Sequence, residues 1–187
     1  MSTQRLGGVL IITGLILAIV ASMVFPSEYY TAKDQGARQA IMNANRSGWI
    51  ATNWLWIAAS IVTTIGLFLI ALRDRSLLSM AGMGLFSIGS AFWIVYLYLR
   101  SLDVSVSDNS LWMEAVFAWL DTVGLALLGI AFLRSDFSNW VGYVNIGYGI
   151  LFVLVFLLFR TQMYEFFPPQ VIYMVALFTG IVVVRRG

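Results

Sequence analysis

Six apolar stretches, each long enough to cross a lipid bilayer, occupy most of this chain of 187 residues. They cover residues 6–25, 50–72, 77–99, 112–133, 140–159 and 169–184. A bilayer core takes about 20 apolar residues per helix, so the sixth stretch only just qualifies. Backbone groups in lipid have to be paired within the protein, and runs of this length therefore predict helices. We expect an all-α, polytopic membrane protein, with six transmembrane helices forming one bundle and one domain over residues 1–187.

The composition limits the chemistry that such a bundle can carry. The chain is 60% hydrophobic and 11% charged, and it has no cysteine and no histidine. Thiol catalysis, disulfides and iron–sulfur ligation are thereby excluded, and the commonest metal ligand and general base is missing. We therefore expect no enzymatic activity, no metal site and no cofactor ligated by His or Cys. A bound lipid, quinone or pigment is compatible with this composition.

The arginines predict the orientation. The side that carries both termini has more arginine than acid, and positive charge near span ends marks the cytoplasmic face. Its basic residues are Arg5, Arg73, Arg75, Arg134, Arg185 and Arg186. We expect both termini to be cytoplasmic, in the plasma (inner) membrane of a prokaryote. Basic residues form no run that would bind nucleic acid. The first apolar stretch is too long for a signal-peptide core, so we expect a retained span.

The polar segments predict how the spans are connected. Tight turns at 73–76 and 134–139 should make spans two and three, and spans four and five, antiparallel neighbours. In the long segment after span one, Asp34 can cap a short helix near 34–45 and pair with Arg38 at i, i+4. Its apolar face would hold Ala37, Ala40, Ile41 and Ala44. We expect this amphipathic helix to lie at the outer membrane surface.

Glycine spacing indicates an internal repeat. Spans one, three and five each carry two glycines seven residues apart, and spans two and four share a Trp followed ten residues later by Thr-[Ile/Val]-Gly-Leu. The glycines are Gly7 and Gly14, Gly82 and Gly89, Gly142 and Gly149, with Gly66 and Gly124 in the second motif. Three copies of a two-helix hairpin would explain the pattern. Glycines seven apart share a helix face and let helix backbones approach closely, so we expect them at helix contacts.

Many aromatic residues fall toward the outer ends of the spans. They are Tyr29, Tyr30, Trp49, Trp54, Trp56, Trp93, Tyr96, Tyr98 and Trp112. Trp and Tyr concentrate at membrane interfaces, so we interpret them as interfacial belts. The alternative is a shallow outer groove for a lipid, quinone or pigment.

Two acidic residues within the spans could carry chemistry. Glu114 and Asp121 are seven apart on span four, which places them about 10 Å apart on one face. Asp121 falls near mid-membrane, where low dielectric disfavours a charged carboxylate. Side chains at similar depth that could donate to it are Thr63, Thr64, Ser90 and Tyr148. Asp121 is then either a proton or ion site with Glu114 as outer relay, or a neutral clamp between helices. A single deep acid makes a poor pathway, which favours the clamp.

The sequence thus predicts an architecture but not an activity. The hypothesis it favours is a non-catalytic membrane subunit or scaffold that packs against lipids, pigments, other membrane proteins or further copies of itself. The alternative hypothesis is a small proton-coupled transporter in which Asp121, opposite Thr63 in the repeat, carries the coupling charge.

Overall fold

The computed structural model describes residues 2–26, 28–32, 34–74, 76–102, 111–159 and 170–186. Within these ranges the chain is helical and contains no strand. The helices are α1 (Thr3–Val24), α2 (Glu28–Thr31), α3 (Gln35–Ala44), α4 (Arg46–Ala71), α5 (Leu77–Leu102), α7 (Leu111–Leu133), α8 (Asn139–Leu158) and α10 (Gln170–Arg186). The sequence-based prediction of an all-α protein with membrane-spanning helices is confirmed in this general form.

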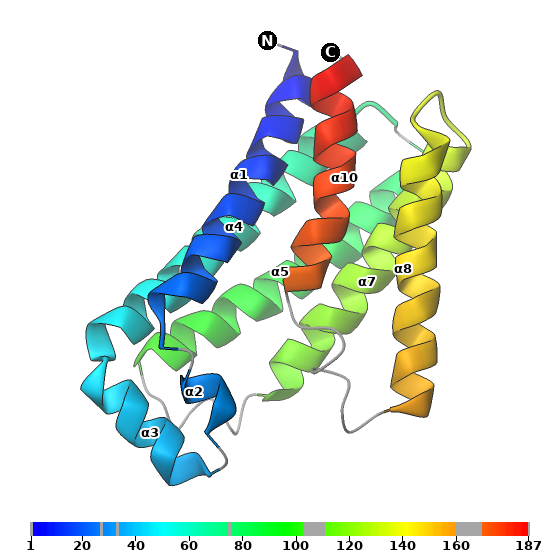
Figure 1. Cartoon of the computed structure of the whole chain (residues 1–187). Coiled ribbons are helices and arrows are strands. Elements are labelled where there is room, and N and C mark those ends of the chain that lie inside the picture. The colour runs from blue at the N-terminus through cyan, green and yellow to red at the C-terminus, as the bar shows by residue number, and fades with distance from the viewer. Residues whose placement is uncertain are drawn as a thin grey trace.

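Five of these helices are long and apolar enough to cross a membrane: α1, α4, α5, α7 and α8. The described part of the predicted sixth span, α10, has 17 residues, a length of about 26 Å against a bilayer core of about 30 Å. The length of α10 alone therefore does not qualify it as a sixth membrane span. Both termini nevertheless lie at the same end of the bundle, and α2 and α3 lie at the other (Figure 1).

The long helices are arranged around one core. Helix α1 packs against α4 and α10, α4 against α5, α5 against α7, and α7 against α8, whereas α8 and α10 contact each other much less. The helices on either side of each tight turn, α4 with α5 and α7 with α8, are neighbours, as the short turns predicted. Figure 1 shows these turns at the end that carries the termini.

Glycines lie at the closest helix contacts. A methyl group built on Gly7 of α1 would lie 2.6 Å from the carbonyl oxygen of Gly66 on α4. The same arrangement recurs between α5 and α7, where a methyl group on Gly82 would lie 2.8 Å from the carbonyl oxygen of Gly124. Only glycine allows backbones to approach this closely. The first two predicted hairpins therefore pack in the same way.

The third predicted hairpin packs differently. Gly142 of α8 faces Gly129 of α7, and Gly149 of α8 faces α7 as well. On α10, Gly180 faces Gly8 of α1 instead of α8. A threefold hairpin repeat thus remains a prediction, because the matched contacts cover only two of its copies.

The belt interpretation is wrong for four of the aromatic residues. Trp49, Trp56, Trp93 and Tyr96 are only 1%, 6%, 3% and 3% exposed, because the last three fill the core between the long helices and Trp49 packs in a smaller core with Phe25. Glycine pairs bring the helices together in the half nearer the termini, whereas these large rings occupy the other half. By contrast, Trp54, Tyr98 and Trp112 are about half exposed and suit the belt.

Helix α3 begins at its expected cap. The Asp34 carboxylate accepts a hydrogen bond from the backbone N–H of Ala37 at 2.7 Å. Among the residues of α3 whose burial is described, Met42 is the buried one, and it joins Phe25 and Trp49 in a small second core. The predicted apolar face is therefore displaced: Ala40 and Ala44 are exposed, because α3 contacts the bundle along a narrow strip. The Nε of Arg38 donates to the Ala32 carbonyl at 3.0 Å.

Candidate functional site

The deepest acidic side chain is Asp121, near the middle of α7 and 1% exposed. Its carboxylate packs against Gly89 of α5, where a methyl group would clash with the carboxylate oxygen Oδ1. Gly89 is thus needed to make room for the carboxylate. Ser90, the next residue on α5, donates its hydroxyl to Oδ2 at 3.0 Å. The second oxygen, Oδ1, has no hydrogen-bond partner in the described part of the chain.

Three further buried polar groups gather beside Asp121, from three helices. The hydroxyl of Tyr173 on α10 lies within interaction range of Ser60 on α4, Trp93 on α5 and Asp121. Tyr173, Ser60 and Trp93 are 2%, 1% and 3% exposed. Within the described chain these polar atoms come close enough to interact with one another, but none of the pairs reaches full hydrogen-bond geometry. We call these three residues, with Ser90 and Asp121, the Asp121 site.

Unpartnered groups of this kind are costly. A buried donor or acceptor without a partner costs about 1–3 kcal/mol, so most folds avoid it. Here the Oδ1 of Asp121 is such a group, and the weakly paired polar groups of Ser60, Trp93 and Tyr173 lie close by on three other helices. A proton, a water molecule or a polar group of a ligand placed among them would supply the partners. The arrangement is therefore suited to binding something small.

Aromatic rings enclose the site on the side toward α2 and α3. The ring of Trp93 stacks on Phe117 at 4.7 Å and on Tyr96 at 5.4 Å between centroids. Trp56 contacts both Trp93 and Tyr173, at 6.3 Å and 5.6 Å. These rings keep lipid and bulk water away from Asp121, and the low local dielectric strengthens every polar interaction there.

The other candidates from the sequence divide into two groups. Tyr148 of α8 lies near Asp121, and its hydroxyl accepts a hydrogen bond from the Thr122 hydroxyl at 3.5 Å. Thr63 instead packs against Gly14 at the contact of α1 with α4, and the hydroxyls of Thr63 and Thr64 have no partner among the described residues. The structure thus places Ser90 and Tyr148 beside Asp121 and gives Thr63 a contact in another helix pair.

Sequence reasoning missed three members of the site. The sequence pattern places Trp93 in the interfacial belt and includes neither Ser60 nor Tyr173 among the candidates. The sequence feature that could have identified them is their predicted depth in the membrane, because each falls on a different apolar stretch at the level of Asp121. Hydroxyl groups are common in membrane helices, so depth alone did not separate them from ordinary packing residues.

The end of the bundle near α2 and α3 carries a charged pair. Glu114 is half-buried in the first turn of α7, seven residues or about 10 Å from Asp121. Arg100, from the last turn of α5, lies within electrostatic range of Glu114. Its guanidinium lies over the Trp49 ring, 4.2 Å from the centroid, and its backbone carbonyl accepts the Trp49 indole N–H at 3.0 Å. Arg100 is thus fixed between Glu114 and the aromatic core.

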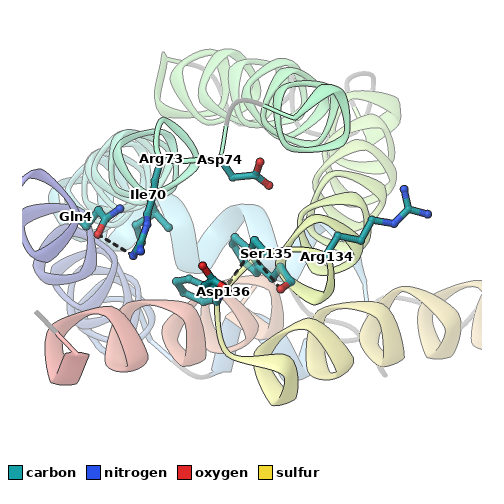
Figure 2. Close-up of a pocket in the computed structure, with 9 residues that line it drawn as sticks. Gln4, Ile70, Arg73, Asp74, Arg134, Ser135 and Asp136 are labelled. Carbon is teal, nitrogen blue, oxygen red and sulfur yellow. Dashed lines mark hydrogen bonds between the residues drawn. The ribbon is translucent and has the colours of Figure 1, made fainter.

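A cavity of about 300 Å³ opens at the opposite end, where both termini lie. We call it the terminal cavity. Its lining comes from α1, the end of α4 and the turn between α7 and α8, as Figure 2 shows. The lining residues are Gln4, Ile70, Arg73, Asp74, Phe132, Arg134, Ser135, Asp136 and Phe137. Sequence analysis did not anticipate this cavity, because it forms where segments distant in the chain meet.

The terminal cavity does not reach Asp121 in this conformation. Phe132, in its lining, lies eleven residues along α7 from Asp121, a separation of about 16 Å. Leu125 and Leu128, which lie between them on α7, are fully buried. Apolar packing therefore separates the cavity from the polar site.

Comparisons with protein families, with curated proteins and with solved structures find no match to this chain.

Proposed function

We propose that this chain is a small proton-coupled carrier in which Asp121 binds and releases the coupling proton. The observation that carries the proposal is the unpartnered, buried Oδ1 of Asp121 beside the polar side chains of Ser60, Trp93 and Tyr173. Buried polar atoms without a partner also occur at Asn145 and Thr63 in the described chain, and Asp121 differs from these because its side chain can carry a proton or a charge. The geometry thus favours the hypothesis that the sequence ranked second.

The proposed chemistry is the loading and unloading of one proton. A proton on Oδ1 leaves a neutral carboxyl group that can donate to a neighbouring hydroxyl, while Ser90 donates to Oδ2. When the proton leaves, the carboxylate needs further donors, which Tyr173 and Trp93 can provide. Protonation therefore changes which contacts among α5, α7 and α10 are favourable. That change would couple the proton to helix movement.

The two ends of the bundle would serve as the two access routes. Glu114 and Arg100 lie toward α2 and α3, and the terminal cavity lies at the other end. Transport requires that the apolar packing around Leu125 and Leu128 opens, because it separates the cavity from Asp121. Binding at mid-membrane between two access routes is the usual arrangement of carriers.

We further propose six spans, with α10 as the sixth and both termini cytoplasmic, in a prokaryotic plasma membrane. The common location of the termini and the surplus of arginine at that end support this orientation. Labelling of single cysteines at Ser76 and at exposed Ser47 tests it, because the chain has no native cysteine. The residue Ser107, also suitable by sequence, lies outside the described residues. If Ser47→Cys were labelled only from the cytoplasm, the topology would be the reverse of the one proposed.

The decisive experiment is Asp121→Asn in proteoliposomes that hold a pH gradient and an internal pH-sensitive dye. Asparagine keeps the size and hydrogen bonding of the side chain but cannot titrate. We expect proton flux to be lost while the protein stays folded. The matched control is Asp34→Asn, which removes an exposed carboxylate and keeps a good helix cap. Flux by Asp121→Asn equal to that of the wild type would refute the proposal.

A second candidate function, a scaffold for other membrane proteins or for further copies of this chain, is favoured by two glycines. A methyl group built on Gly84 of α5 or Gly147 of α8 would meet nothing within 4 Å. Glycine costs a helix about 1 kcal/mol relative to alanine, and no contact within the described chain explains why glycine occurs at these positions. A partner helix packed against either face would explain it.

The scaffold is tested by native mass measurement after mild solubilisation, with Gly84→Leu and Gly147→Leu. Wild-type protein should carry a partner, a second copy or bound lipid, and either substitution should release it. A wild-type monomer of 20.8 kDa without any bound molecule would count against the scaffold.

A further inference from the structure

The two helices joined by the turn at 73–76, α4 and α5, are not brought together by glycines. Gly66 of α4 faces Gly7 of α1, and Gly82 of α5 faces Gly124 of α7. No glycine of the described chain lies at a close contact between α4 and α5 themselves. A groove of about 460 Å³ lies between these two helices beside the turn, at the end of the bundle that carries the termini. We call it the α4–α5 groove.

The α4–α5 groove is apolar over most of its lining. Its floor is formed by Ala71, Ser79 and Met83, which are 8%, 0% and 5% exposed. The Ser79 hydroxyl donates to the Ala71 carbonyl at 3.4 Å, so the polar group of the floor is paired. The walls include Phe68 of α4 and Met80 of α5, which are half exposed or more. Both helices are long and apolar enough to cross a membrane, so the groove opens toward the lipid chains.

Among the described residues, the charged one in the groove lining is Asp74, beside the turn. Its carboxylate accepts the backbone N–H and the hydroxyl of Ser76, both at 3.0 Å. A carboxylate has about four acceptor positions, so Asp74 can accept further donors. Arg73 lies outside the groove lining and donates to Gln4 of α1 at 3.5 Å (Figure 2). The groove therefore combines an apolar channel with a negative charge at the end where the membrane surface would lie.

We propose that the α4–α5 groove binds a phospholipid with a primary ammonium headgroup, of the phosphatidylethanolamine class. The ammonium group would donate to the Asp74 carboxylate, since hydrogen bonds between charged groups are the strong ones. One acyl chain would lie along the groove against Met80 and Met83, whose flexible side chains fit irregular apolar shapes. The chain would also cover Gly84, where a methyl group would meet nothing within 4 Å of the described chain.

The size and the charge of the groove favour this occupant over two others. Two turns of a partner helix, about 10 Å across and about 10 Å long, would need more space than the groove has. An anionic lipid, which the arginines at this end of the bundle would attract in general, would be repelled by Asp74 within the groove. Lipid binding requires no proton transport, so this inference goes beyond the carrier and does not depend on it.

Binding is tested by native mass spectrometry of the purified full-length protein in detergent micelles. The probes are phosphatidylethanolamine and phosphatidylglycerol with identical acyl chains. We expect phosphatidylethanolamine to bind about threefold more tightly, the difference expected for one solvated ion pair. Asp74→Asn should remove this preference, while the asparagine oxygen can still accept from Ser76. Gly84→Leu should weaken both lipids about fivefold or more, because the leucine side chain would overlap the acyl chain.

Two matched controls lie outside the groove lining. Asp136→Asn removes an exposed carboxylate at the same end of the bundle, and Gly147→Leu places the same side chain in open space on α8. Both variants should bind the two lipids as the wild type does. Asp74→Asn leaves the apolar lining unchanged, so it tests the headgroup contact whether or not Gly84→Leu folds.

Three results would overturn the inference. The first is equal binding of the two lipids by the wild type, and the second is a preference that survives Asp74→Asn. The third is an equal loss of lipid in Gly84→Leu and Gly147→Leu, which would indicate a general partner surface, as in the scaffold, instead of a lipid site in the groove.

Discussion

Replacement of Gly82 by alanine should loosen the contact between α5 and α7. The added methyl group would lie 2.8 Å from the carbonyl oxygen of Gly124 and 3.0 Å from the backbone nitrogen of Leu128. Both atoms belong to the backbone, so no side chain can move aside and the helices have to separate. Overpacking of this kind costs about 1–3 kcal/mol. Alanine also gains about 1 kcal/mol in helix propensity, which partly offsets that cost.

The matched control is Gly84→Ala, two residues further along α5, where the methyl group would meet nothing within 4 Å. It gains the same propensity without the overpacking. The difference in stability between the two variants therefore isolates the overpacking, and Gly82→Ala should be the less stable by about 1–3 kcal/mol. Reversible unfolding in mixed detergent and SDS micelles, followed by Trp fluorescence, measures it. Equal stabilities would refute the helix contact described above.

Three further substitutions test other contacts of the structure. Trp93→Ala should destabilise the bundle by about 3–5 kcal/mol in the same unfolding assay, because it empties the centre of the aromatic core. Trp49→Phe should cost about 1 kcal/mol there, since it removes the indole N–H that donates to the Arg100 carbonyl. Asp34→Ala should speed hydrogen exchange in the first turn of α3, and Asp34→Asn should not, because asparagine also caps helices.

The sequence predicted which residues face another helix but not which helix they face. Glycines seven apart share one face, and Gly7, Gly82 and Gly142 all lie at close helix contacts. The spacing is the same in each case, yet Gly7 and Gly82 face the next long helix in the chain, whereas Gly142 faces the preceding one. Spacing defines a face of a helix, and the choice of neighbour depends on how all the helices pack together.

Hydropathy could not tell the inside of the bundle from its lipid-facing surface. Trp54 and Trp56 lie two residues apart on α4, and the first is 51% exposed while the second is 6% exposed. Lipid and protein core are both apolar, so neither position violates a burial rule. For the same reason, hydropathy does not identify Trp93 as a member of the Asp121 site. The carboxylate of Asp121 was identifiable because a charge in lipid is costly wherever it faces.

The two hairpins that pack alike, α1 with α4 and α5 with α7, carry different residues at the position of Asp121. Thr63 lies against Gly14 three residues before Gly66, and Asp121 lies against Gly89 three residues before Gly124.

A threonine therefore suffices for packing at the equivalent place, and Asp121→Thr would give the second hairpin the residue of the first. We expect this variant to fold with a stability within about 1.5 kcal/mol of the wild type, because threonine is close to aspartate in size and its hydroxyl can still accept from Ser90. It should transport no protons, because a hydroxyl cannot replace a titrating carboxylate. Unfolding measurements and proteoliposome flux test the two expectations separately. A variant that fails to fold would identify Asp121 as a structural clamp, and a folded variant with full flux would exclude it as the proton site.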